Sequence, residues 1–280
     1  MTKEHIIIDF EQAKVFLDRH PGGEMTLGEA LRLAGGGDDD ENMLPISGLK
    51  CSGWIKELLG EDADDEIATN IEQPEKFLGT LRPYQQRGLT WLAFLDRFGL
   101  GACLADDMGL GKTIQLIALL QYERAKSERK PGPTLLVCPM SVMGNWKREL
   151  ERFAPELSVQ IQHGPERATG DDFWRLTQSA DVIITTYALV SRDIGHLEPI
   201  EWERIVLDEA QHIKNPPTKQ TAAIRSLKTH RRIALTGTPV ENRLAELWSI
   251  MEFCCPGFLG TNGDFRKRFA VPIERHRDER

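Results

Sequence analysis

The sequence predicts an α/β fold in which a mostly parallel sheet is covered by helices on both faces. Its 280 residues are 40% hydrophobic and 28% charged, which is the composition of an ordinary globular chain. From about residue 80 onward, short apolar runs recur that have the length of strands and mostly lack inside/outside alternation, as strands buried on both faces do. Helical stretches separate several of these runs, and such alternation of strand and helix is typical of a parallel sheet.

Six strands and three helices are expected in this regular part of the chain. The expected strands are residues 102–105, 134–138, 159–162, 181–185, 205–207 and 233–235. The expected helices are residues 113–126, 145–153 and 218–226. In a sheet of this kind, ligands bind at the carboxyl ends of the strands. Polar residues that directly follow a strand are therefore the first candidates for a functional site.

The first 76 residues differ from the rest of the chain in charge. They carry 7 basic and 18 acidic residues, a net charge of −11, whereas residues 77–280 carry 28 and 25, a net charge of +3. Short helical patterns, among them residues 9–20, predict that this front segment is mainly helical. We therefore expect an acidic, mainly helical segment at 1–76 that is distinct from the α/β part beginning at residue 77. Because the excess of acid lies at the front, the overall charge of −8 does not exclude binding of nucleic acid by the lobe.

The sequence contains no signal for a membrane span, a secretory leader or a metal cluster. No apolar run approaches the ~20 residues that a membrane helix requires, and no basic region followed by an apolar stretch opens the chain. The five cysteines include no CxxC pair, and Cys103 and Cys138 lie in expected strands. We interpret them as small buried hydrophobic residues in a reducing compartment.

The first motif is a glycine-rich turn between the strand at 102–105 and the following helix. Its two glycines, Gly109 and Gly111, allow backbone N–H groups to face phosphate oxygens, and the helix dipole adds to the attraction. Lys112 is expected to reach the outer phosphates, and the Thr113 hydroxyl to bind Mg²⁺. The pattern GxxxxGKS/T is not met, because Asp106 occupies the first glycine position. The alternative is a chance Gly-Lys-Thr in a capping turn, but the flanking strand and helix favour a phosphate loop.

The second motif is a pair of carboxylates after the strand at 205–207. That strand delivers Asp208 to its carboxyl end, where it is expected to hold Mg²⁺, usually through water, and Glu209 is the candidate base for an attacking water. If this pair stood alone in the sequence, we would interpret the segment as a strand followed by a polar turn without a catalytic role. The pair stands 96 residues after Lys112 in the same predicted sheet, and this combination is more specific than either motif.

With both motifs in place, the sequence resembles superfamily II helicase-type motors, specifically the Swi/Snf branch of double-stranded-DNA translocases. Six segments in chain order carry the resemblance: 81–92 (LRPYQQRGLTWL), 106–113 (DDMGLGKT), 136–149 (LVCPMSVMGNWKRE), 183–187 (IITTY), 208–211 (DEAQ) and 235–248 (LTGTPVENRLAELW). The resemblance as a whole covers the chain from Leu81 to about Phe269, roughly two-thirds of it. The family's own phosphate loop begins with an acidic residue, as Asp106 does here. The resemblance implies a RecA-like P-loop NTPase lobe. Residues 22–30 more loosely resemble the helicase-associated region that precedes the motor in bacterial members.

The resemblance also implies roles for individual residues. The expected nucleotide contacts are Gln85, which would read adenine, and Asp107, Met108, Gly109, Leu110, Gly111, Lys112 and Thr113. Thr113 and Asp208 would hold Mg²⁺, and Lys112, Asp208 and Glu209 would be catalytic. Thr236, Gly237 and Thr238 would sense loss of the γ-phosphate and transmit it.

A further set is expected to contact a DNA backbone: Pro139, Ser141, Asn145, Thr185 and Thr186. These residues follow two strands, and their hydroxyl, amide and backbone donors suit phosphate oxygens. The alternative is a loop turn and strand-end threonines that satisfy one another. Trp146 and Trp248 are interpreted as core anchors rather than stacking platforms, and His212 and His230 as polar surface residues.

The function implied by the resemblance is an ATP-dependent motor that moves along double-stranded DNA and remodels bound proteins, with ATP and Mg²⁺ as cofactors, in the bacterial cytoplasm. It also implies that residues 77–270 form the first RecA-like lobe and that residues 271–280 begin the connection to a second one. That second lobe, with motifs IV to VI, is expected after residue 280. The arginines of that lobe would complete the site, and an arginine finger is worth ~10³–10⁵ in rate in related systems. Weak hydrolysis is expected of the first lobe alone. Two alternatives remain open: an RNA or single-strand helicase lobe, and a nucleotide-binding scaffold without motor activity.

Overall fold

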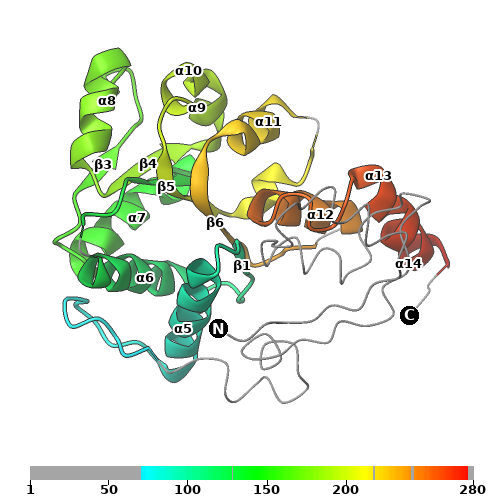
Figure 1. Cartoon of the computed structure of the whole chain (residues 1–280), viewed down its shortest axis with the longest axis horizontal. Coiled ribbons are helices and arrows are strands. Elements are labelled where there is room, and N and C mark those ends of the chain that lie inside the picture. Colours follow the sequence, from blue (N-terminus) through cyan, green and yellow to red (C-terminus); the bar gives the residue numbers. More distant parts are fainter. Residues whose placement is uncertain (1–70, 128, 217, 241–242, 277–280) are drawn as a thin grey trace, which may run out of the picture. The chain divides into compact units, whose positions relative to one another are not determined.

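The computed structural model describes residues 71–276, apart from residues 128, 217, 241 and 242. The described residues fall into two compact units, of which the larger ends at Cys255 and the smaller begins at Pro256. The helices expected within the first 70 residues lie outside the described part of the chain. The larger unit contains all the strands described below (Figure 1).

The larger unit is built on a six-stranded sheet in which every pairing is parallel, which confirms the predicted fold class. The strand order is β1-β6-β5-β2-β4-β3. Their bounds are β1 (Ala102–Leu104), β2 (Thr134–Cys138), β3 (Val159–Ile161), β4 (Val182–Thr186), β5 (Trp202–Asp208) and β6 (Thr229–Leu235). The first four strands agree with the expected ranges to within one residue. The last two begin three and four residues earlier than expected.

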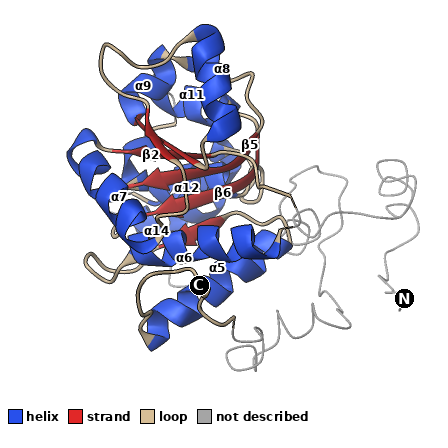
Figure 2. Cartoon of the chain, turned by 90° about the vertical axis from the view of Figure 1, so that its left-hand side faces the viewer, coloured by secondary structure: helices blue, strands red, loops and turns tan. Residues whose placement is uncertain are grey.

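Helices cover both faces of this sheet, as Figure 2 shows. The first core includes residues from three helices: α5 (Pro83–Arg97), α6 (Lys112–Lys126) and α7 (Met140–Phe153). The second core includes residues from five: α8 (Gly170–Ser179), α9 (Tyr187–Arg192), α10 (Ile194–Leu197), α11 (Lys219–Ser226) and α12 (Leu244–Cys254). The smaller unit consists of α13 (Asn262–Phe265), a π-helical turn (Arg266–Ala270) and α14 (Val271–His276).

Residues of one strand alternate between the two cores. Leu136 and Cys138 of β2 belong to the first core, and Leu135 and Val137 belong to the second. Because both faces are covered, the strand reads in the sequence as an uninterrupted apolar run. The exception is β3, which pairs with β4 alone and leaves Ile161 36% exposed at the sheet edge.

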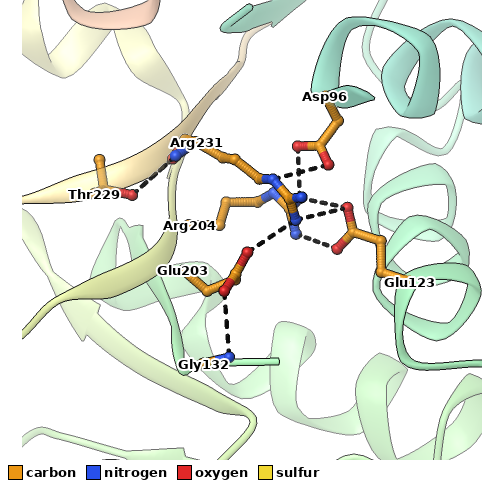
Figure 3. Close-up of polar contacts among 7 residues, drawn as sticks. All are labelled: Asp96, Glu123, Gly132, Glu203, Arg204, Thr229 and Arg231. Carbon is orange, nitrogen blue, oxygen red and sulfur yellow. Dashed lines mark hydrogen bonds and ion pairs between the residues drawn. The ribbon is translucent and has the colours of Figure 1, made fainter. Parts of the chain in front are cut away.

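A cluster of ion pairs at the amino-terminal edge of the sheet explains why β5 and β6 begin early (Figure 3). Arg204 of β5 is fully buried and donates two hydrogen bonds to Glu123, of 2.7 and 2.6 Å, and one of 2.7 Å to Asp96. Arg231 of β6 pairs with Asp96 at 3.0 Å and with Glu203 at 2.9 Å. A charged residue was not expected inside a strand with two buried faces, yet these carboxylates allow Arg204 to lie there.

Two smaller expectations concern single residues. Cys103 and Cys138 lie in β1 and β2 as predicted, and Cys138 is completely buried as a free thiol. Trp146 and Trp248 are buried in helices α7 and α12, as predicted for core anchors. Among the described helices, none is long and apolar enough to cross a membrane.

Candidate nucleotide site

The predicted site residues meet at the carboxyl edge of three neighbouring strands. Strand β6 lies between β1 and β5, with Leu235 opposite both Leu104 and Asp208. The chain after β1 continues into the glycine-rich turn, and the backbone N–H of Thr236, directly after β6, donates to the Leu104 carbonyl at 3.2 Å. The topology therefore brings together motifs that are far apart in the sequence.

The glycine-rich turn has a backbone that favours glycine at two positions. Gly109 has φ of +87° and Gly111 has φ of +83°, both in the left-handed region. Gly111 is also the N-cap of α6, which begins at Lys112, one residue earlier than expected. A Cβ atom at Gly111 would lie 2.5 Å from Nε2 of Gln85, so a side chain does not fit there without movement. The turn thus presents backbone at the amino end of a helix, as a phosphate loop does.

Two side chains fix the ends of this turn. The Lys112 ammonium donates to the carbonyl oxygens of Asp106 at 2.6 Å and Asp107 at 3.1 Å. The Asp106 carboxylate accepts a hydrogen bond of 2.8 Å from Gln115 of α6. Asp106, which replaces the first glycine of the GxxxxGKS/T pattern, is therefore hydrogen-bonded to α6, the helix that follows the turn.

Gln85 links the first motif to the same turn. It is buried, and its Nε2 donates to the Leu110 carbonyl at 3.0 Å, while its Oε1 accepts from the Arg82 backbone N–H at 2.9 Å. The Tyr84 hydroxyl donates to the same Leu110 carbonyl at 3.1 Å. Both ends of the Gln85 amide thus have partners within the protein, and these contacts hold helix α5 against the turn.

The Asp208 carboxylate is held by two donors. The indole N–H of Trp146 donates to Oδ2 at 2.6 Å, and the backbone N–H of Glu209 donates to Oδ1 at 3.0 Å. Burial raises the pKa of Asp208, and the nearby Glu209 charge raises it further, whereas the two hydrogen bonds and the Lys112 charge oppose the shift. This carboxylate is therefore both desolvated and fixed in orientation.

The next residue, Glu209, has an unusual backbone. Its φ is +52°, and among the described non-glycine residues it alone has a positive φ. The Tyr187 hydroxyl donates to the Asp208 carbonyl at 2.7 Å and lies 3.3 Å from that of Glu209. Strained backbone of this kind occurs at functional sites, where the surroundings hold it.

Gln211 connects Glu209 to the residues after β6. Its Nε2 donates to Oε2 of Glu209 at 2.7 Å, and its Oε1 accepts from the Thr236 hydroxyl at 2.9 Å. The Thr236 hydroxyl oxygen also accepts from the backbone N–H of Thr238 at 3.1 Å. At Gly237, an added Cβ would lie 3.0 Å from the side chain of Met108, so this residue lies against the turn. The predicted coupling residues therefore touch both the carboxylate motif and the glycine-rich turn.

The residues predicted to contact DNA are divided between surface and interior. Ser141 and Asn145 are exposed on α7, and Pro139 is its half-buried N-cap. Thr185 is only 1% exposed, and its hydroxyl donates to the Gln162 carbonyl at 3.1 Å. Thr186 is buried as well, at the N-cap of α9. Strand β4 has neighbours on both sides, which leaves Ser141 and Asn145 as the exposed members of this predicted set.

Sequence reasoning missed three contributors to the site. The sequence motifs assign no role to Gln211 or Tyr187, and the pattern around Trp146 indicates a core anchor alone. Their partners are distant in the chain: Thr236 lies 25 residues from Gln211, and Asp208 lies 21 residues from Tyr187 and 62 from Trp146. His212 and His230 are exposed, as predicted, although the His212 ring also stacks on Tyr187 at a centroid distance of 4.8 Å.

The donor set fits a nucleotide with its magnesium ion. A metal bound through phosphates and water needs only one or two protein oxygens, and Thr113 at the first turn of α6 and Asp208 would provide them. Within the part of the chain that the structure describes, no group of three or more His, Cys, Asp or Glu side chains forms an alternative metal site. The glycine turn and Lys112 supply backbone and ammonium donors suited to phosphate.

Comparison with known proteins places this geometry in a family. The model of the SNF2-related domain matches residues 84–280. The protein of Bacillus subtilis (strain 168) that bears the name "Putative ATP-dependent helicase/translocase YwqA" is 54% identical over 250 residues, covering 88% of this chain and 27% of YwqA. The TATA-binding protein-associated factor MOT1 of Saccharomyces cerevisiae is 37% identical over 240 residues, covering 80% of this chain and 12% of MOT1.

A solved structure gives the same result. The SWI2/SNF2 ATPase core of Sulfolobus solfataricus in complex with double-stranded DNA superposes with a TM-score of 0.67 at 45% identity, covering 74% of this chain and 42% of that one. The chain thus spans about a quarter of the length of YwqA and less than half of the Sulfolobus core. Its parallel sheet is that of a lobe of this core. Since the family model covers well over half of the residues, the chain belongs to the SNF2-related family.

Proposed function

We propose that this chain is the first ATP-binding lobe of a motor that moves along double-stranded DNA and remodels proteins bound to it. The observation that carries the proposal is the convergence of Lys112, Asp208, Glu209 and Thr236 at one edge of the sheet, with Gln211 joining the last two. The names of YwqA and of the DNA-bound Sulfolobus core support the same class of activity.

Each group at the edge has a task in this proposal. The glycine turn and Lys112 bind the phosphates of ATP. Gln85 contacts the adenine by exchanging one of its partners in the protein, such as the Leu110 carbonyl, for the base. Thr113 and Asp208 hold Mg²⁺, which neutralises phosphate charge when bound. Gln211 occupies Oε2 of Glu209, so Oε1 is the oxygen that we assign to accept a proton from the attacking water.

DNA would lie along the surface that α7 presents beside this edge. Ser141 and Asn145 are exposed there and would contact phosphates of one strand. A second RecA-like lobe would supply the opposite wall and the arginines that complete the site. We therefore expect the 280-residue chain to bind ATP–Mg²⁺ weakly and to hydrolyse it slowly without that lobe.

Calorimetry with ATP–Mg²⁺ tests the nucleotide site. Lys112→Ala is expected to abolish the heat of binding, and Asp208→Ala to weaken binding in the presence of Mg²⁺. Lys126→Ala is the matched control, because it removes a lysine from the exposed last turn of the same helix. Equal affinities for wild type and Lys112→Ala would contradict the proposed nucleotide site.

The nucleic-acid partner is tested by comparing duplex DNA, single-stranded DNA and RNA in binding and in stimulation of ATP hydrolysis. We expect duplex DNA to bind best, with affinity that falls steeply with salt and little with sequence, because the contacts are to phosphates. Preference for RNA or a single strand would favour the helicase alternative. If the protein binds nucleotide but neither duplex DNA, single-stranded DNA nor RNA, the scaffold alternative would be favoured.

A further inference from the structure

Trp146 combines a packing role with one specific polar contact. Its side chain is 2% exposed and belongs to the core between the sheet and helices α5 to α7. Its indole N–H donates to Oδ2 of Asp208 at 2.6 Å, from a helix that begins directly after a strand adjacent to β5. A buried indole usually finds a partner for its N–H, but here the partner is the acidic residue of the candidate metal site.

The contact leaves the Asp208 carboxylate with little freedom to rotate. Trp146 donates to Oδ2, and the Glu209 backbone donates to Oδ1 at 3.0 Å, so one donor is bound to each oxygen. Each oxygen retains a second acceptor position for a metal ion or its water. Hydrogen bonds of this kind, from groups that do not touch the metal, orient metal ligands and raise their affinity.

Helix α7 also carries the exposed residues of the proposed DNA surface. Asn145 directly precedes Trp146 in the sequence and is exposed, whereas Trp146 faces the core. Ser141 is exposed at the start of the same helix. A single helix therefore joins that surface to the carboxylate of Asp208.

We infer that Trp146 is a positioning residue that holds the Asp208 carboxylate in the orientation that binds Mg²⁺ and ties α7 to the metal site. The metal role rests on the proposed function. The hydrogen bond itself does not, and the two are tested separately.

The hydrogen bond is tested by NMR of the 280-residue protein with ¹⁵N-labelled tryptophan. Each of the six tryptophans contributes one indole N–H signal, and the signal that is lost in Trp146→Phe is that of Trp146. Asp208→Asn is expected to shift that signal and to leave that of Trp202 unchanged. Trp202 is an internal control, because it is equally buried, lies on the same strand as Asp208 and donates its indole N–H to the Leu197 carbonyl at 3.1 Å. A Trp146 signal that is identical in wild type and Asp208→Asn would overturn the inference.

The metal role is tested by the Mg²⁺ dependence of binding of a fluorescent ATP analogue. Trp146→Phe keeps an aromatic ring but loses the N–H, so we expect the half-saturating Mg²⁺ concentration to rise ~10–100-fold. Affinity for the nucleotide in EDTA should not change. Trp202→Phe makes the same chemical change elsewhere and should retain the wild-type Mg²⁺ dependence.

The outcomes of the two tests distinguish a wrong positioning role from a wrong proposed function. Equal Mg²⁺ dependence of Trp146→Phe and Trp202→Phe would overturn the positioning role. If wild-type protein binds no nucleotide at any Mg²⁺ concentration while the Trp146 signal still responds to Asp208→Asn, the proposed function and the metal role fail together, and the hydrogen bond alone stands.

Discussion

At the scale of single residues, Gly109 and Gly111 share a left-handed backbone but not their surroundings. Apart from Gly109 itself and its two chain neighbours, no atom lies within 4 Å of the position a Cβ would take at Gly109, whereas at Gly111 that position is 2.5 Å from Gln85. Their φ angles differ by only a few degrees. The pair therefore separates the cost of backbone strain from the cost of a steric clash.

We predict that Gly111→Ala destabilises the protein more than Gly109→Ala. Both substitutions force alanine into the left-handed region, at a cost of ~1–2 kcal/mol, but Gly111→Ala must also displace the buried Gln85 amide and its bond to Leu110. Urea denaturation without nucleotide measures both free energies of unfolding. Equal losses would show that Gln85 moves aside freely and does not restrict this turn.

At the scale of secondary structure elements, the ion-pair cluster and the candidate site occupy opposite ends of the same four elements. Helices α5 and α6 carry Asp96 and Glu123 near their last turns, and strands β5 and β6 carry Arg204 and Arg231 near their starts. Toward their other ends, the same elements deliver Gln85, Lys112, Asp208 and Thr236. The cluster thus fixes the positions along the sheet of the elements that build the site.

We predict that Arg204→Met lowers the free energy of unfolding by about 3–5 kcal/mol, because Glu123 and Asp96 lose their fully buried hydrogen-bond donor and retain only Arg231. Arg175→Met is the control: this arginine is 71% exposed and pairs with the exposed Asp172, so its loss should cost less than about 0.5 kcal/mol. Urea denaturation at pH 7 compares them. A cost for Arg204→Met within the range of the control would mean that the cluster contributes no net stability.

Glu123 makes the stability of this cluster depend on pH. Burial raises its pKa from 4.5 to about 7, and Asp96 adds to the shift, although Arg204 opposes it. Because the folded-state pKa lies above the unfolded value, the contribution of Glu123 is fully present below pH 4.5 and is lost as pH rises through 7. The isosteric variant Glu123→Gln does not titrate. We predict that the stability of wild type relative to Glu123→Gln falls between about pH 5 and pH 8 by up to roughly 3 kcal/mol.

Denaturation of both proteins at pH 5, 6, 7 and 8 measures this difference. Subtracting the two curves removes all other titrating groups, provided that they are unaffected by the substitution. If the difference in free energy of unfolding between wild type and Glu123→Gln stays constant or rises with pH, Glu123 remains ionised throughout this range.

The sequence was sufficient for features that depend on neighbours in the chain. Uninterrupted apolar runs located the six strands that the structure describes. Local glycine and carboxylate motifs predicted where Lys112 and Asp208 lie, at the start of α6 and the end of β5. It was insufficient for Arg204, whose partners Glu123 and Asp96 lie 81 and 108 residues away. A charged residue within a strand is indistinguishable from a loop residue until such partners are known, which is why the starts of β5 and β6 were misjudged.

The same limit applies to the site. Trp146 has the pattern of a core residue, and it is one, but its N–H also has a partner 62 residues away that only the packing of α7 on the sheet reveals. Thr185 and Thr186 have the residue types of a phosphate contact, yet β4 is covered on both faces and buries them. Local sequence thus predicted which chemical groups are present, and the fold determined which of them reach solvent.

At the scale of the whole molecule, charge is divided unevenly along the chain. Residues 1–76 carry a net charge of −11 and residues 77–280 carry +3. A polyanion such as DNA is attracted by the second part and repelled by the first, and these long-range forces act on the rate of association before any specific contact forms. The acidic front is therefore expected to restrain binding of DNA to the lobe.

We predict that removing charge from the front strengthens DNA binding at low salt. Replacing the acidic run at 38–41, its three Asp by Asn and its Glu by Gln, changes the net charge from −8 to −4 without shortening the chain. Stopped-flow fluorescence measures the rate of association with a short DNA duplex. At about 50 mM salt, this rate should be several-fold higher than that of wild type. The difference should shrink near 0.5 M salt, where the Debye length is only a few ångströms. A control variant that replaces Ser47 and Ser52 by Ala alters the same segment without changing its charge and should bind as wild type does. If this charge-neutral variant and the four-charge variant associate equally fast at low salt, the acidic front has no electrostatic influence on the DNA surface.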